Sequence, residues 1–351
     1  MKVLVMMSGG VDSSVAAAML RDQGHHVVGV TLKLWGGESD SGCCSVSDVD
    51  DARRAADALG VDHHVFDFGE AFTRHVVAPY AADHRAGQTP NPCIECNRHL
   101  KFAAVDERAR ALGFDAIATG HHARVVVHPD GTRRVARGAD RAKDQSYVLH
   151  VLGQDVLART LLPLGHLTKP EVRAIAAGLG LATATKPDSQ DVCFIRRDTG
   201  RTTFLGDRIP LTPGRVVDRT GAELGTVEAV ELVTVGQRRG LGLAGGGAPR
   251  YVVDVDLRSA TVVVGDRDDL LVAEQPVAGL RWAAAPELGP VMVQCSAHGA
   301  PQAAVIEPSP AGSAAEGAAV VRWDEPQRRV APGQSVVAYV GDEVVAGAIA
   351  T

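Results

Sequence analysis

The feature that most constrains the fold of this chain is a loop near its N-terminus that is rich in Gly and Ser. The loop reads Ser8-Gly9-Gly10-Val11-Asp12-Ser13-Ser14. It joins an apolar segment typical of a β-strand, residues 2–7, to an Ala-rich segment typical of a helix, residues 12–23. Glycines allow backbone amides to approach an anion closely, and the start of the following helix adds the positive end of its dipole. The loop therefore predicts a phosphate site between a strand and a helix.

The residue types in this loop narrow the kind of phosphate site. Ser8 and Ser13 supply hydroxyl donors, and the Asp12 carboxylate can hold a magnesium ion that bridges phosphate oxygens. The loop lacks the Gly-Lys-Ser/Thr ending of a Walker loop and does not match the Gly-x-Gly-x-x-Gly pattern of dinucleotide-binding folds. A Gly-rich turn that only caps a helix is the structural alternative.

Strand and helix signals alternate over roughly the first two hundred residues, where further strands are predicted at residues 26–34, 64–68 and 115–119. This alternation predicts a doubly wound parallel α/β sheet. After residue 205 short β-branched runs between turns predict two small antiparallel β-barrels. We therefore expect an α/β domain, a small central β domain and a C-terminal β-barrel, with the boundaries 1–204, 205–268 and 269–351.

The distribution of charged and apolar residues limits which partners this chain can bind and in which cellular compartment it can work. The net charge of −6 does not favour a general nucleic-acid binder, but residues 196–215 contain five Arg and two Asp, a local patch that could hold phosphates or form a solvated basic face. No apolar run approaches the about 20 residues of a membrane span, and the N-terminus does not resemble an export signal. We therefore expect a cytoplasmic protein that makes no use of a membrane.

In a reducing compartment the six cysteines are expected to be catalytic or metal-binding rather than structural disulfides. Two of them stand in distinctive segments, Cys96 in residues 91–97 and Cys193 in residues 186–195. Cys96 lies at a predicted helix start with Arg98 close by, and both features favour a thiolate. A thiolate can carry a persulfide or open one by exchange.

Metal binding is the alternative use of these cysteines. Cys93 and Cys96 have Cys-x-x-Cys spacing, and Cys193 could join them around an iron–sulfur cluster. The adjacent Cys43 and Cys44 could complete a zinc set, although adjacent cysteines are poor ligand geometry for zinc.

The phosphate loop resembles that of the PP-loop ATP pyrophosphatases, which bind ATP and release pyrophosphate. The two cysteine segments resemble those of the bacterial tRNA 2-thiouridylases within that superfamily. The resemblance extends through most of the chain, over residues 120–124, 143–147, 236–242 and 332–334. It implies ATP-dependent 2-thiolation of the wobble uridine of tRNA, through an adenylated intermediate and a cysteine persulfide. It also implies ATP and Mg²⁺ as cofactors, and tRNA and a persulfide sulfur donor or relay protein as partners.

The same resemblance implies roles for individual residues. The ATP site would comprise Met6, Met7, Ser8, Gly9, Gly10, Val11, Asp12, Ser13, Leu32 and Gly120. The catalytic pair would be Cys193, which holds the persulfide, and Cys96, which attacks it to free sulfide or to leave a Cys96–Cys193 disulfide. The target base would face Asn91, Pro92 and Cys93, and other parts of the tRNA would contact His121, Lys143, Asp144, Gln145 and Gln334.

Two positions depart from the family pattern. Cys93 stands where the family often has Asp, and Ser296-Ala297-His298-Gly299 stands where it has an Arg-rich tRNA contact.

Three other functions remain open: an ammonia-using PP-loop ligase, an iron–sulfur-dependent tRNA thiolase, and a tRNA-binding protein with a vestigial ATP loop. A ligase has no use for Cys96 and Cys193, and an intact Asp12 argues against a vestigial loop.

Overall fold

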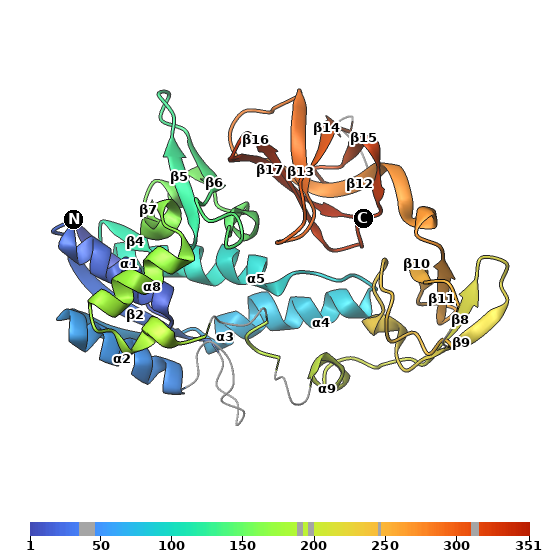
Figure 1. The fold of residues 1–351 in the computed structure, drawn as a ribbon, viewed down its shortest axis with the longest axis horizontal. Coiled ribbons are helices and arrows are strands. Elements are labelled where there is room, and N and C mark those ends of the chain that lie inside the picture. The colour runs from blue at the N-terminus through green and yellow to red at the C-terminus, as the bar shows by residue number, and fades with distance from the viewer. Residues whose placement is uncertain (35–45, 188–191, 196–199, 245–246, 310–315) are drawn as a thin grey trace.

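The computed structural model describes residues 1–34, 46–187, 192–195, 200–244, 247–309 and 316–351. An N-terminal α/β part, a small central β part and a C-terminal barrel follow one another along the chain (Figure 1). Within the described ranges, no helix has both the length and the apolar character needed to cross a membrane.

The N-terminal part is built on a parallel sheet of five strands in the order β3-β2-β1-β4-β7. These strands are β1 (Lys2–Met6), β2 (His26–Lys33), β3 (Asp62–Asp67), β4 (Ala116–Ala118) and β7 (Thr160–Leu161). Strand β1 is apolar at nearly every position because helices cover both faces of the sheet, which is the pattern of doubly wound folds. The predicted α/β class is confirmed.

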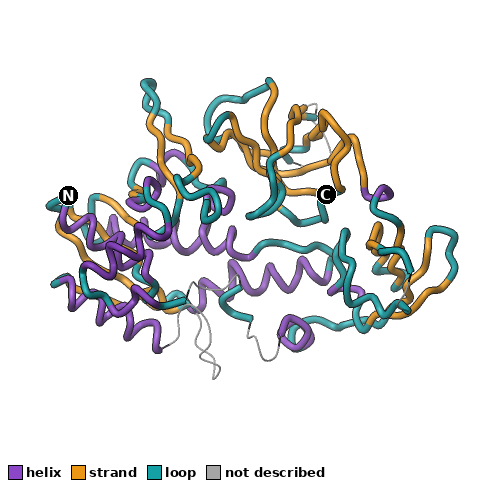
Figure 2. Tube along the Cα trace, in the orientation of Figure 1, coloured by secondary structure: helices purple, strands orange, loops and turns teal. Residues whose placement is uncertain are grey.

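Helices on the two faces of this sheet form separate apolar cores. On one face Val5 of β1 packs with Val15, Ala52 and Val172, which belong to α1 (Val11–Asp22), α2 (Val46–Leu59) and α8 (Lys169–Gly178). The other face is covered by two longer helical runs, which Figure 2 shows in purple. These runs are α3 (Gly69–Phe72), η1 (Thr73–Val77) and α4 (Ala78–Arg85), then α5 (Pro92–Glu95), η2 (Cys96–Ala104) and α6 (Val105–Ala111).

Both of these runs contain a π-helical segment, η1 in the first and η2 in the second. Wide turns of this kind are uncommon and often occur at functional sites. Shorter helical segments complete the first two hundred residues and the start of the next part. They are η3 (Ser146–Leu149), α7 (Gln154–Leu157), η4 (Pro163–His166), η5 (Ala182–Thr185) and α9 (Gly200–Gly206).

The central part is a four-stranded sheet in the order β10-β11-β8-β9 with its own apolar core. Two of its pairings are antiparallel, whereas β11 pairs with β8 in parallel. The elements are β8 (Gly214–Asp218), β9 (Glu223–Val227), η6 (Val230–Leu232), β10 (Tyr251–Asp256) and β11 (Thr261–Gly265).

Strands β12 to β17 of the C-terminal part close into a barrel, because β12 pairs with both β15 and β17. The elements are η7 (Asp268–Leu270), β12 (Leu271–Trp282), β13 (Pro290–Gln294), β14 (Gln302–Pro308), β15 (Ala319–Arg328), β16 (Ser335–Val340) and β17 (Glu343–Ala350). Closure satisfies the edge strands that an open sheet leaves unpaired. The predicted succession of small β domains is confirmed.

A hairpin of the N-terminal part extends the sheet of this barrel. It consists of β5 (Ala123–Val127) and β6 (Arg133–Arg137), and β6 pairs with β17 at Ala136 and Glu343. The Tyr147 hydroxyl donates to the Ser335 carbonyl over 2.9 Å and strengthens the same junction. This hairpin, which was not predicted from the sequence, joins the first and last parts of the chain through one sheet.

Candidate active site

The predicted phosphate loop lies between the carboxyl end of β1 and the start of α1. Gly9 has a φ of +72°, which an L side chain rarely adopts, and Gly10 precedes α1 with an extended backbone. The Ser8 amide donates to the Ser13 hydroxyl over 3.1 Å, and the hydroxyls of Ser13 and Ser14 donate to the Gly10 carbonyl. The loop is therefore held in shape by its own serines.

The loop makes two close backbone contacts, one with the segment after β4 and one with α2, and each contact leaves room only for a glycine. A Cβ on Gly120, just after β4, would lie 2.6 Å from the Ser13 amide nitrogen and 2.7 Å from the Asp12 carbonyl carbon. A Cβ on Gly9 would clash with the backbone of Asp48 in α2. Strands β2 and β4 flank β1 on opposite sides, so the loop lies where the strand order changes direction, the usual binding crevice of an open α/β sheet.

Asp12 is the charged centre of the site. Lys169 donates to both of its carboxylate oxygens, over 2.8 and 2.7 Å, and His122 Nε2 lies 3.2 Å from Oδ1. The side chains of Lys169 and His122 are only 10% and 3% exposed, whereas that of Asp12 is 31% exposed. Burial raises the pKa of Asp12, but the hydrogen bonds from His122 and Lys169 outweigh burial and hold this pKa below its usual range. The carboxylate is therefore ionised and open on one side.

A second lysine joins the loop to α2. Lys186 Nζ donates to the Gly9 carbonyl over 3.0 Å and to the carboxylates of Asp48 and Asp51 over 2.7 and 2.5 Å. Burial lowers the pKa of Lys186, but the hydrogen bonds that Lys186 donates to the two carboxylates outweigh it and raise this pKa above its usual value. Sequence analysis named neither Lys169 nor Lys186 as a site residue, because each lies far along the chain in a segment without a phosphate pattern.

The donor set at Asp12 fits a magnesium ion that is held mainly by phosphate oxygens. Magnesium is usually bound in this way by one or two carboxylates together with substrate phosphates. Both Asp12 oxygens already accept from Lys169, so an ion there would share or replace this contact.

The remaining residues of the predicted ATP site divide between the two faces of the sheet. Met6 and Leu32 are buried on the face covered by the π-helical runs. Met7 and Val11 are buried in the core on the opposite face. The Met7 backbone is itself engaged, since its amide donates to the Val30 carbonyl and its carbonyl accepts from Thr31. The predicted ATP-site residues are therefore split between two apolar cores, and their contact with a nucleotide stays a prediction.

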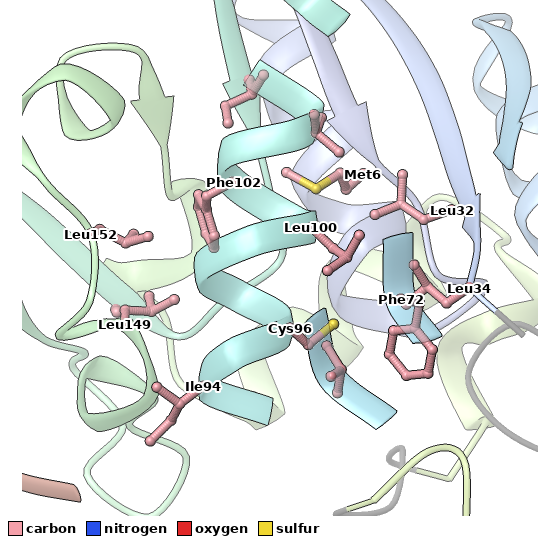
Figure 3. Packing of buried hydrophobic residues seen from close by; sticks show 14 of the residues in the cluster. Met6, Leu32, Leu34, Phe72, Ile94, Cys96, Leu100, Phe102, Leu149 and Leu152 are labelled. Carbon is pink, nitrogen blue, oxygen red and sulfur yellow. The ribbon is translucent and has the colours of Figure 1, made fainter. Parts of the chain in front are cut away.

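The first cysteine segment begins a helix. Asn91 caps α5 by accepting a hydrogen bond from the Cys93 amide over 3.0 Å, and Pro92 occupies the first helical position, where a missing N–H costs nothing. The helical run begins at Pro92, one turn before Cys96, so the prediction that Cys96 lies at a helix start is wrong, and Cys96 is instead the first residue of η2. Figure 3 shows Cys96 on the inner side of this helix, near Phe72 and within the apolar cluster. Cys93 is only partly buried.

The segment that carries Cys193 is anchored by an aromatic side chain. Phe194 is buried and contacts Phe72, Tyr80 and Phe204, with ring centroids 5.5, 5.6 and 5.1 Å apart. Cys193 itself packs against the same apolar cluster that contains Cys96. Two cysteines that are far apart in the sequence thus adjoin one apolar core, and their pairing stays a prediction.

Cys93, Cys96, Cys193 and Cys295 each carry a thiol that is not part of a disulfide. Among the residues that the structure describes, no group of three or more His, Cys, Asp or Glu side chains is arranged to hold a metal ion. The predicted zinc alternative also involved Cys43 and Cys44, which lie outside the described residues.

Most of the residues predicted to contact tRNA make internal contacts here. Asp144 is almost buried, where it pairs with Arg137 over 3.1 Å. Gln145 accepts a hydrogen bond from the His122 amide, and Gln334 donates to the Thr89 carbonyl. The assignment of these residues to tRNA stays a prediction.

His121 and Lys143 complete that predicted set. His121 Nδ1 lies 2.7 Å from the Thr119 hydroxyl, and burial lowers the pKa of His121 to about 3, so the ring is neutral near pH 7. Lys143 lies in a turn and is exposed.

Part of the predicted basic patch can be located. Arg196 and Arg197 lie outside the described residues. Arg201 donates to the Leu232 carbonyl, and Arg208 folds back onto Phe204, where it donates to the carbonyl and lies 3.9 Å from the ring centroid. Phosphate binding by this patch stays a prediction.

Comparisons with known families match nearly the whole chain. The family described as tRNA methyl transferase HUP domain matches residues 1–197. The one described as tRNA methyl transferase PRC-barrel domain matches residues 202–266, and the one described as aminomethyltransferase beta-barrel domain matches residues 277–350.

Two bacterial relatives are similar to almost the whole chain. The chain is 48% identical to the tRNA-specific 2-thiouridylase MnmA of Acidothermus cellulolyticus, over 99% of this chain and 97% of the relative. It is 46% identical to the protein of the same name from Cutibacterium acnes, over 99% of this chain and 96% of the relative.

Among solved structures, a 4-thiouridine synthetase in complex with RNA and bound ATP matches with 20% identity and a TM-score of 0.38. That match covers 55% of this chain and 44% of the synthetase. On the identity and coverage of the curated relatives, the chain belongs to the tRNA-specific 2-thiouridylase family.

Proposed function

We propose that this chain is an ATP-dependent enzyme that thiolates C2 of the wobble uridine of tRNA through an adenylated uridine and a cysteine persulfide. Its family membership makes it a tRNA-uridine sulfurtransferase. One observation carries the proposed chemistry. The core that contains Met6 and Leu32, beside the phosphate loop, also contains Cys96, and Cys193 packs against it. Activation and sulfur transfer would therefore occur at neighbouring positions.

In the first step the uridine O2 attacks the α-phosphorus of ATP, an O–P bond forms, and pyrophosphate leaves. The loop residues would bind the phosphates through the amides around Gly9 and Gly10 and the start of α1. Asp12 would hold a magnesium ion, which supplies positive charge to the phosphate oxygens when it is bound. Removing water from the crevice strengthens each of these interactions.

In the second step sulfur replaces the adenylated oxygen. Cys193 carries a terminal sulfur as a persulfide, and the Cys96 thiolate attacks the Cys193 sulfur. The persulfide S–S bond then breaks, a Cys96–Cys193 disulfide forms, and the terminal sulfur is released as sulfide or transferred directly to C2. AMP leaves from C2, and a dithiol reductant restores both thiols. Each turnover consumes one persulfide sulfur from the donor.

Partners, compartment and domain limits follow from the same proposal. The substrate is tRNA, and the sulfur arrives from a persulfide donor or relay protein in the cytoplasm. We also propose that the catalytic, central and C-terminal domains span residues 1–204, 205–268 and 269–351. The limits of these domains can be checked by limited proteolysis.

The proposed function is tested by incubating the protein with ATP, magnesium, sulfide and bulk tRNA. The expected products are pyrophosphate and 2-thiouridine, the latter measured by mass spectrometry of digested nucleosides. Pyrophosphate release that depends on ammonia and leaves tRNA unmodified would instead identify a ligase. ATP binding without any thionucleoside, with either sulfide or a persulfide donor, would contradict the proposal.

A further inference from the structure

Lys169 occupies an unusual position for a lysine. It is the first residue of α8, its side chain is almost buried, and its ammonium group contacts both oxygens of Asp12. Removing a lysine ammonium from water costs several kcal/mol unless a counter-charge and hydrogen bonds compensate. Asp12 provides that counter-charge while no nucleotide occupies the loop.

The backbone of Lys169 is fixed even though its side chain is long. Thr168 and Glu171 form a capping box at the start of α8, and the Lys169 amide donates to Asp140 over 2.9 Å. The four-carbon stem therefore pivots from a stationary point beside the loop. An ammonium group on such a stem can exchange one oxygen partner for another without moving the helix.

Magnesium and Lys169 compete for the same carboxylate. Both Asp12 oxygens accept from Lys169, and these oxygens are the ligands that Asp12 would offer to an ion. His122 Nε2 also lies 3.2 Å from Asp12 Oδ1, so Asp12 keeps this hydrogen-bond partner if the Lys169 ammonium group leaves. A buried ammonium group that loses its carboxylate needs a new anion, and the incoming phosphates are the nearest source.

We propose that Lys169 is a phosphate-binding residue of the loop, whose ammonium group passes from Asp12 to the β- and γ-phosphates when magnesium-bound ATP enters. It stays with these phosphates as they leave as pyrophosphate. In the empty site the same ammonium group neutralises Asp12 and keeps the loop closed on α8. This inference rests on the proposed function only in requiring that the loop binds ATP.

The test measures binding of pyrophosphate and of AMP separately, by isothermal titration with magnesium present. Loss of one charged hydrogen-bond donor is expected to weaken pyrophosphate binding by roughly 10- to 100-fold in Lys169→Met. AMP, which lacks the β- and γ-phosphates, is expected to bind within about twofold of wild type. The matched control is Lys2→Met, which removes the same charge at the opposite end of β1, where Lys2 contacts the Leu112 carbonyl.

A double-mutant cycle with Asp12→Asn separates phosphate binding from simple charge balance. Without magnesium, Asp12→Asn should bind pyrophosphate more tightly than wild type, because Lys169 is no longer held by a carboxylate. This gain should be lost in Asp12→Asn/Lys169→Met. Thermal melting of each variant shows whether the protein remains folded. The double variant lacks both the Asp12 carboxylate and the Lys169 ammonium group, so no buried charge is left without a counter-charge.

The outcomes distinguish this inference from the proposed function. If folded Lys169→Met binds pyrophosphate as tightly as wild type and differs only in a lower melting temperature, Lys169 serves only as a counter-ion for Asp12. That result would overturn the inference. Wild-type protein that binds neither ATP nor pyrophosphate would overturn the proposed function together with the inference. Normal ATP binding by wild type, with equal losses of AMP and pyrophosphate binding in Lys169→Met, would also reject a role specific to phosphates.

Discussion

Asp12 is held by Lys169 and His122, so its charge and orientation are set before any ligand arrives. Preorganised charge of this kind favours catalysis, and the only rearrangement proposed at this carboxylate is the move of the Lys169 ammonium group to the phosphates. The carboxylate is nevertheless partly exposed, which leaves a path to the phosphates. At the scale of single residues, we therefore expect the proposed activation step to depend strongly on this side chain.

Asp12→Asn is expected to lower tRNA-dependent pyrophosphate release by roughly 10²- to 10³-fold, the usual cost of removing one preorganised electrostatic group. The amide keeps the size of the carboxylate but loses the charge that a magnesium ion requires. Release is measured by a coupled phosphate assay, with circular dichroism as the control for folding. A rate of pyrophosphate release close to that of wild type would show that Asp12 does not hold a magnesium ion needed for this step.

Cys193→Ser is expected to abolish thiolation from a protein persulfide donor while tRNA-dependent pyrophosphate release continues. Cys96→Ser should leave sulfur trapped on Cys193, which mass spectrometry of the intact protein detects. Cys295→Ala is the matched control, because burial in the barrel raises the pKa of that thiol to about 12 and makes it unreactive. Thiolation by either of the first two variants at the wild-type rate would refute the two-cysteine relay.

Cys93→Asp restores the residue that much of the family carries. If Cys93 only faces the target base, the variant should thiolate tRNA at a rate within about tenfold of wild type, since a small polar group still lines the site. Iron content and thiolation are measured after anaerobic purification of both proteins. Stoichiometric iron in wild type, lost together with activity in Cys93→Asp, would support the iron–sulfur alternative.

At the scale of elements, the loop is shaped by the close approach of β4 and α2 as well as by its own residues. Gly120 packs on the backbone of Asp12 and Ser13, and Gly9 packs on α2 near Asp48. The strand–loop–helix unit was predictable because its signals are contiguous in the sequence. The packing of Gly120 was not, because it joins segments more than a hundred residues apart.

Gly120→Ala is expected to reduce pyrophosphate release more than tenfold, because the new methyl group must push the Ser13 amide out of the phosphate loop. A shift of this size in a positioned group typically costs about a hundredfold in rate. The matched control is Gly178→Ala, at a glycine where an added Cβ meets no atom within 4 Å. Equal rates in the two variants would show that the loop tolerates displacement.

At the scale of the whole molecule, the hairpin β5–β6 makes the C-terminal barrel an extension of the N-terminal part. His150 is half-buried at this junction beside Gly347, and a Cβ on Gly347 would clash with the His150 ring. Desolvation lowers the pKa of His150 to about 3, so the ring is neutral, and its Nε2 lies 3.3 Å from the Ser335 hydroxyl. The junction is therefore tightly packed.

Gly347→Ala is expected to lower the free energy of unfolding by about 1–3 kcal/mol, the usual cost of overpacking a filled core. Urea unfolding followed by tryptophan fluorescence measures this loss, since Trp282 and Trp323 pack in the barrel. Gly289→Ala, where an added Cβ meets nothing, is expected to change stability by less than about 0.5 kcal/mol. Equal stabilities would mean that the junction is loosely packed.

The phosphate loop, the α/β class and the succession of small β domains were predictable from the sequence, because these features follow from residue types and periodicity within short segments. The sequence also singled out Cys96 and Cys193, whose distinctive neighbours lie beside them in the chain. Only the tertiary structure decided that Lys169 and Lys186 join the loop and that β6 pairs with β17. These contacts form between distant segments when apolar faces pack, and no local pattern of residues records which segments will meet.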